Sequence, residues 1–156
     1  MKPVEMKLRV YASQSTDASG FASYPDQSLA ITNNSEWSNL VTTFTKFKVK
    51  GGRVHLIPKS PTQIGYQALR AYFAGEEGVA PTGTTLSSLI EEGLGPVVQA
   101  NKRVTLKALN PPKNILSTAD EADEADIILQ TGAAACSTNQ SDYWAMVLEW
   151  DIIFYR

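Results

Sequence analysis

The stretch YWAMVLEWDIIFYR, residues 143–156, alternates between two kinds of side chain. From 144 to 154 the even positions are all apolar: Trp144, Met146, Leu148, Trp150, Ile152 and Phe154. The odd positions are mixed and include Glu149 and Asp151. A period of two predicts a β-strand with one apolar face, and a long strand of this kind belongs in the middle of a sheet that packs on a second layer. The stretch is too short to span a membrane, so we expect no membrane partner.

The same alternation predicts further strands. In residues 4–12, apolar side chains again occupy alternate positions. Longer strands are expected at 44–57, 65–74, 103–109 and 126–134, and shorter ones at 28–32 and 95–100. Within 44–57 the apolar positions change parity across Gly51 and Gly52, which predicts a bulge or a tight bend there.

Two short helices are expected between these strands. The segment NNSEWSNLVTTF, residues 33–44, offers Asn34 or Ser35 as a helix cap, followed by apolar residues at helical spacing. The segment TTLSSLIEEGL, residues 84–94, has the same character and ends at Gly93. About eight strands without alternating long helices predict an all-β antiparallel sandwich or barrel, folded as a single domain over residues 1–156.

Composition restricts the function classes. The chain is 43% hydrophobic and 19% charged with a formal net charge of −2, so its overall charge does not predict a nucleic-acid partner. Cys136 is the single cysteine and cannot form an internal disulfide. His55 is the single histidine, and neither a nucleophile elbow nor a phosphate-binding glycine motif is found. We therefore expect that the protein is not an enzyme.

The order of the elements resembles that of a known family. A capped helix with Trp37 leads into a strand, a basic glycine bend and VHLIP, and a further strand opens at Gly65. APTGTTLSSLIEEG, RVTLKALNPP and the final YWAMVLEWDIIF follow. Over residues 37–156, with 4–12 as the first strand, the chain resembles the single jelly-roll shell domain of small icosahedral viruses, as found in tombusvirus-like RNA viruses and circular single-stranded DNA viruses.

The resemblance implies an eight-stranded jelly roll with strands named B to I, in the sheets B-I-D-G and C-H-E-F. On this basis B is assigned to 4–12, C to 44–57, D to 65–74, F to 103–109, H to 126–134 and I to 142–155. It also implies a capsid protein of the virion, whose partners are further copies of itself in a closed shell of about 60 or 180 subunits. Viral nucleic acid is a further possible partner, although the basic arm usual in this family is not found before residue 4.

Two other classes stay open at this point. One is a carbohydrate- or ligand-binding jelly-roll module, for which the segments 24–26 and 33–34 offer aromatic, Asp and Asn side chains. The other is a trimeric decoration-type β-sandwich.

Charged residues supply the candidate sites. We expect the C-H-E-F sheet to gather a basic surface for nucleic acid or a neighbouring subunit, made of Lys46, Lys48, Lys50, Arg53, Lys102, Arg103 and Lys107. A solvated face is the alternative. On the other sheet, Glu149 and Asp151 are expected to pair with Lys7, Arg9 and Arg70 on adjacent strands.

The segment STADEADEAD, residues 117–126, is densely acidic. The resemblance suggests calcium at subunit interfaces, with Asp120, Asp123 and Asp126 as candidate ligands. Calcium takes about six to eight oxygens, so a neighbour or backbone carbonyls would have to complete the site. Ion pairing with a neighbour's basic face, or a solvated loop, are the alternatives.

Overall fold

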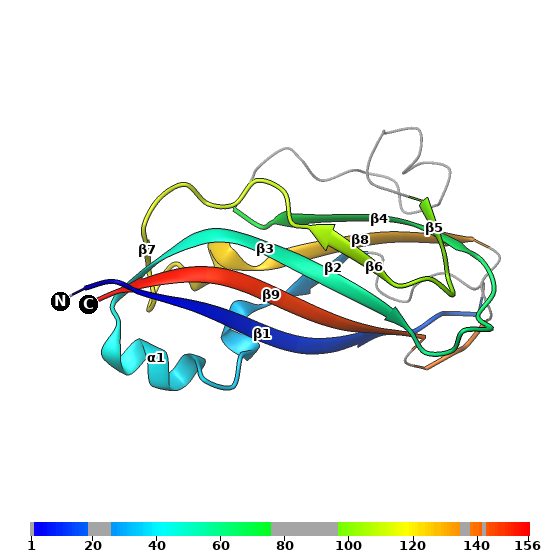
Figure 1. The fold of residues 1–156 in the computed structure, drawn as a ribbon, viewed down its shortest axis with the longest axis horizontal. Helices are drawn as coiled ribbons and strands as arrows, with labels where there is room; N and C mark the ends of the chain where they lie inside the picture. Colours follow the sequence, from blue (N-terminus) through cyan, green and yellow to red (C-terminus); the bar gives the residue numbers. More distant parts are fainter. Residues whose placement is uncertain (1, 19–25, 76–96, 135–137, 142) are drawn as a thin grey trace.

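Strands are the main secondary structure among the residues that the computed structural model describes, which are 2–18, 26–75, 97–134, 138–141 and 143–156 (Figure 1). The elements are β1 (Val4–Gln14), β2 (Asp26–Leu29), η1 (Ile31–Asn33), α1 (Trp37–Thr43), β3 (Lys46–Pro58), β4 (Tyr66–Phe73), β5 (Val97–Gln99), β6 (Val104–Lys107), β7 (Leu116–Ser117), η2 (Ala122–Ala125), β8 (Ile127–Ala134) and β9 (Trp144–Tyr155), where η is a 3-10 helix. Within these residues, none of the helices has the length and apolar character needed to cross a bilayer.

Strand β9 lies in the middle of the first sheet, antiparallel to β1 on one side and β3 on the other (Figure 1). It is paired along its whole length with both neighbours: Phe154 lies opposite Val4 and Phe47, and Trp144 lies opposite Gln14 and Pro58. Its six apolar even residues are at most 1% exposed. The central strand predicted from the alternation is therefore confirmed.

Two sheets stack to form the sandwich. The first has the order β1-β9-β3-β6, with β7 also paired to β3, and the second has the order β2-β8-β4-β5. Their facing side chains form one buried core, to which β1, β3, β6 and β9 contribute from one side and β4 and β8 from the other. These orders correspond to B-I-D-G and C-H-E-F, so the predicted fold class is confirmed.

Three individual strand assignments are wrong. Strand β3 takes position D rather than C, β4 takes E rather than D, and β6 takes G rather than F. Positions C and F belong to β2 and β5, which are only four and three residues long. Short strands are expected at 28–32 and 95–100, which overlap β2 and β5, but they have no position in the predicted jelly roll. For this reason β3, β4 and β6 are each placed one position too early.

Strand β3 contains the bulge that the parity change predicts. Val49 lies opposite Ile152 and Gly51 opposite Asp151, so Lys50 is an extra residue in β3. The inward positions change from odd to even after it, beginning with Gly52. A Cβ atom at Gly52 would lie 3.0 Å from side-chain atoms of both Ile127 and Phe73 in the facing sheet, so only glycine fits there without displacing them.

Helix α1 covers one end of the sandwich, beside the two chain ends (Figure 1). The side chain of Asn34 accepts a hydrogen bond from the backbone N–H of Glu36 at 2.9 Å, just before the helix. The Trp37 ring packs edge-on against Phe47, with ring centres 5.6 Å apart, and is tilted against Phe154. The first predicted helix is confirmed, but its N-cap residue is Glu36, which makes no side-chain cap hydrogen bond, and not Asn34 or Ser35. The second predicted helix, at 84–94, and Cys136 lie outside the described residues.

Replacing the two glycines of the bulge should have different effects. Gly52→Ala forces its new methyl group against Ile127, Phe73 and the Glu149 carbonyl oxygen, and we expect a loss of about 1–3 kcal/mol in the free energy of unfolding. Gly51→Ala is the matched control because a Cβ there meets nothing within 4 Å. Denaturant titration of both variants measures the difference. Equal stabilities would contradict the close approach at Gly52.

Candidate functional site

The carboxylate of Glu149 is the centre of the charged outer face of the first sheet. It lies on β9 and is only 7% exposed. Arg9 on β1 donates from Nε to Glu149 Oε2 at 2.8 Å, and Arg53 on β3 donates from Nε to Oε1 at 3.4 Å. His55 Nε2 lies 2.6 Å from Oε1. A buried carboxylate is stable only when it is paired in this way.

These contacts change the acidity of Glu149. The hydrogen bond from His55 and then that from Arg9 lower the pKa of Glu149 from 4.5 to about 2, against the opposing effect of burial. The pKa of Arg9 is raised by the same hydrogen bond and charge. Because the carboxylate accepts from His55 Nε2, that nitrogen carries a hydrogen, and Nδ1 faces the hydroxyl of Thr105 on β6 at 2.8 Å. One acidic group thus connects four strands.

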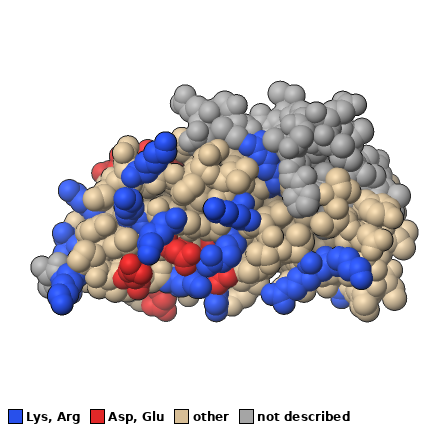
Figure 2. All heavy atoms as spheres, turned by 45° about the horizontal axis from the view of Figure 1, so that its top comes forward, with Lys and Arg blue, Asp and Glu red and all other residues tan. Residues whose placement is uncertain are grey.

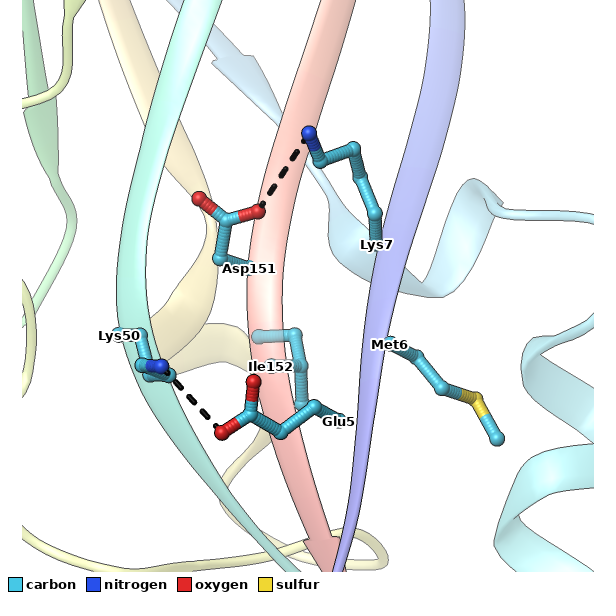
Figure 3. A pocket seen from close by; sticks show the side chains of 6 residues that line it. All are labelled: Glu5, Met6, Lys7, Lys50, Asp151 and Ile152. Atoms are coloured by element: carbon cyan, nitrogen blue, oxygen red, sulfur yellow. Dashed lines mark hydrogen bonds and ion pairs between the residues drawn. The ribbon is translucent and has the colours of Figure 1, made fainter.

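A second carboxylate extends this network along β9. Arg53 Nη2 donates to Asp151 Oδ2 at 3.1 Å, and Lys7 Nζ lies 4.0 Å from Asp151 Oδ1. Next to it, Lys50 Nζ donates to Glu5 Oε1 at 3.4 Å. Figure 3 shows these two Lys–carboxylate pairs around a hollow of about 460 Å³, into which the bulge residue Lys50 reaches from β3. The hollow therefore has alternating charges on its walls.

Positive charge is in excess on this outer face. The cations on its strands or just before β6 are Lys7, Arg9, Lys46, Lys48, Lys50, Arg53, Lys102, Arg103 and Lys107, whereas the carboxylates on its strands are Glu5, Glu149 and Asp151. Figure 2 shows the Lys and Arg side chains gathered around a smaller acidic group. Since the whole chain has a formal charge of −2, the rest of the protein is acidic. The charge of the protein is strongly divided between its surfaces.

The structure brings the seven predicted basic residues together, but on the other sheet. All lie on or beside β3 and β6, which belong to the first sheet, not to the expected C-H-E-F sheet. Lys50 and Arg53 are in ion pairs. No ion pair is formed by the other five, Lys46, Lys48, Lys102, Arg103 and Lys107, within the residues that the structure describes.

The predicted cross-strand pairs are correct for β1 and wrong for Arg70. Lys7 and Arg9 do pair with Asp151 and Glu149. Arg70 lies on β4 in the second sheet, is only 5% exposed, and has its guanidinium carbon 4.9 Å from the centre of the Tyr72 ring. Arg53 pairs with Glu149 and Asp151 in place of Arg70, because β3 is the second neighbour of β9.

His55 is the functional candidate that sequence reasoning missed. Its outward position on a strand was evident, but a single histidine was considered only as a catalytic or metal-binding residue. The register of β3 places it diagonally next to Glu149, opposite Val147. The signal that could have found it is the series of charged residues at outward positions that precede it on the same strand, which ends at Arg53.

The acidic segment lies apart from this face. Asp120 and Asp123 are exposed, whereas Asp126 is half-buried and accepts the backbone N–H of Ile31 at 3.2 Å, and burial raises its pKa. Ala122 and Ala125 of η2 are buried and fix the segment to the core. Among the described residues no three His, Cys, Asp or Glu side chains gather closely enough to hold a metal ion. The predicted calcium site would need further ligands from a second copy or from backbone carbonyls.

The segments 24–26 and 33–34, which could belong to a ligand-binding module, provide few side chains that could contact a ligand. Asn34 uses both ends of its amide within the chain, since Nδ2 donates to the Arg9 carbonyl oxygen at 2.8 Å and Oδ1 accepts from Glu36. Residues 24 and 25 lie outside the described part.

The Glu149 network predicts a specific loss of stability in acid. Because the folded-state pKa is below its ordinary value, the stabilisation is complete above about pH 4.5 and is lost as the pH falls towards 2. We expect Glu149→Gln to lower the free energy of unfolding at pH 7 by on the order of 2 kcal/mol, and the difference from the parent to shrink below pH 4.5.

Thermal unfolding of both proteins between pH 7 and pH 2.5 measures this effect. Glu5→Gln is the control, because Glu5 is exposed and its pairing with Lys50 should contribute less than about 1 kcal/mol. A Glu149→Gln protein as stable as the parent at pH 7 would show that the network does not stabilise the fold.

The sequence matches no protein-family model and no curated protein. The fold matches chains of solved viruses over nearly its whole length. The chain of a mud crab tombus-like virus has a TM-score of 0.66 at 11% identity, covering 100% of this chain and 83% of that one.

Two further virus structures give the same result. Turnip yellow mosaic virus matches with a TM-score of 0.60 at 13% identity, covering 99% of this chain and 95% of the other. A semi-empty VLP of the nodavirus of the giant freshwater prawn Macrobrachium rosenbergii matches with a TM-score of 0.60 at 12% identity, covering 97% and 94%. The protein thus has the jelly-roll fold found in these virus particles.

Proposed function

We propose that the protein is a viral capsid protein, located in the virion, that assembles with copies of itself into a closed icosahedral shell. The observation that carries this proposal is the two-sided match in length: this chain and the virus chains cover nearly all of each other. The proposed role is structural rather than enzymatic.

The charge distribution supports the same proposal. A shell subunit must meet other copies and, in a filled particle, nucleic acid. A basic face on an otherwise acidic molecule is suited to both, because opposite surfaces of two copies attract each other and phosphate groups bind lysine and arginine.

Imaging of the purified protein tests assembly. We expect negative-stain electron microscopy to show closed shells, and light scattering to give a mass of many subunits. Monodisperse trimers would favour the decoration-type sandwich, and monomers that bind a glycan array would favour the carbohydrate-binding module. Either result would contradict the capsid proposal.

We further propose that the basic face contacts nucleic acid in the particle through the cations without ion pairs. Lys46 on β3 and Lys107 on β6 are both exposed and, among the described residues, free of acidic partners. The double variant Lys46→Ser, Lys107→Ser should assemble but retain less nucleic acid, measured as a lower ratio of absorbance at about 260 to 280 nm.

The control carries the same loss of charge elsewhere. Lys59 and Lys113 are exposed and lie outside the strands of the first sheet, so Lys59→Ser, Lys113→Ser should retain the parent's content. If both double variants lose nucleic acid equally, general charge rather than this face is responsible.

Calcium between copies remains a prediction for the segment that contains Asp120, Asp123 and Asp126. It can be checked on the same particles: swelling in a chelator at neutral pH that calcium reverses would support it. Sensitivity to salt alone would favour direct ion pairs.

A further inference from the structure

A second hollow, of about 240 Å³, opens on the outer face of the first sheet and has an aromatic wall. Arg9, Tyr11, His55, Arg103, Val147 and Glu149 line it. Tyr11 is 74% exposed, although it lies within a strand and not in a loop. Aromatic rings stabilise a protein or a complex mainly when their faces are buried against a partner. The exposed ring of Tyr11 on a basic surface therefore suggests that a partner covers it.

The strand register defines the floor of this hollow. Tyr11 lies opposite Val147, Val147 opposite His55, and His55 opposite Thr105, so one row without Lys, Arg, Asp or Glu crosses all four strands. Val147 in the middle is shorter than its neighbours in the row. The row is therefore a shallow trough with the tyrosine ring at one end.

Cations stand on both sides of the trough. The next row along the strands contains Arg9, Arg53 and Lys107, and Arg103 lines the hollow just before β6. Glu149 is in that same row, but Arg9 and Arg53 offset its charge. Arg103 and Lys107 are exposed and form no ion pair within the described part of the chain. A ligand in the trough would thus meet positive charge at its edges.

We propose that this hollow binds single-stranded nucleic acid, with one base stacked on the Tyr11 ring and phosphates of the same strand held by Arg103, which lines the hollow, and by Lys107 beyond it. An exposed aromatic ring on a sheet surface, flanked by cations, has the chemistry by which proteins bind unpaired bases. Paired bases are excluded because their faces are covered within the duplex. This inference rests on the proposed nucleic-acid role of the basic face and specifies its site.

The chemistry favours nucleic acid over an acidic peptide. A peptide carboxylate could bind the same arginine and lysine, but it would leave the tyrosine ring without a partner. A nucleotide uses both, since it combines a planar ring with an anionic backbone. The base is thus the feature that distinguishes a nucleotide from an acidic peptide. The test must therefore measure the contribution of the base separately from that of the phosphates.

The test compares two fluorescent probes: an oligo(dT) of about eight nucleotides and an abasic oligomer with the same phosphates. For the parent protein we expect roughly 5- to 100-fold tighter binding of oligo(dT). Tyr11→Ser should abolish this preference while leaving abasic binding unchanged, and Tyr11→Phe should retain it because the ring remains. Arg103→Ser should weaken both probes and lower the slope of log affinity against log salt by about 1.

Tyr66→Ser is the matched control, since Tyr66 is 50% exposed but lies on β4 in the second sheet. It should keep the parent's preference. Ultraviolet cross-linking of oligo(dT) should also join thymine to the peptide that contains Tyr11.

Equal binding of the two probes by the parent, or an undiminished preference in Tyr11→Ser, overturns the inference. Shells that still form and retain nucleic acid would leave the proposed capsid function standing in either case.

Discussion

The pairing of β9 on both edges is the constraint on which the rest of the structure depends. Its backbone groups are satisfied by β1 and β3, and its even side chains are sealed against the second sheet. The odd side chains have to point to the outer face. The same strand therefore determines both the apolar core and the position of Glu149 and Asp151, around which the cations of the neighbouring strands are arranged.

The charged face has a structural role as well as a proposed binding role. The alternation of apolar and polar residues keeps the apolar side chains of β1 inward. If β1 slipped by two residues along β9, its apolar side chains would still face inward, but every residue would lie opposite a different residue of β9. With Arg9 opposite Glu149, β1 places a cation next to the buried carboxylate, whereas a slip would put Tyr11 or Lys7 there. Because removing one partner from a buried carboxylate is costly, the network disfavours the slip that would put the uncharged Tyr11 opposite Glu149.

Long strands could be predicted from the sequence because their alternation extends over many residues. The strand at 143–156, the bulge at Gly51 and the pairing of Arg9 with Glu149 follow from local pattern and the expected neighbour. The partners of β3 and β4 could not be predicted reliably. They depend on which sheet positions β2 and β5 occupy, and strands of four and three residues contain no pattern that determines these positions. A shift by one position moved the whole basic set to the wrong sheet and Arg70 to the wrong neighbour.

The sequence indicates which cations belong to the candidate site, but not how they are arranged on the sheet. All seven cations can be identified from the sequence. Which of them form ion pairs depends on the distances between strands that are far apart in the sequence. His55 and Tyr11 become candidates only when the neighbouring strands are known. The residues around them come from β1, β3, β6 and β9, which are far apart in the sequence.

The position of β9 also has a consequence for how the chain folds. Its partners β1 and β3 are synthesised long before it, with Arg9 and Glu149 separated by 140 residues. During translation the first sheet lacks its middle, and the apolar faces of β1 and β3 have no shared neighbour. Folding of this sheet must therefore follow the synthesis of β9, and closing so long a loop makes it slow compared with helical proteins. Until then the nascent protein exposes the surfaces that chaperones recognise, and crowded neighbouring chains could exchange their β9 strands before each has closed its own sandwich.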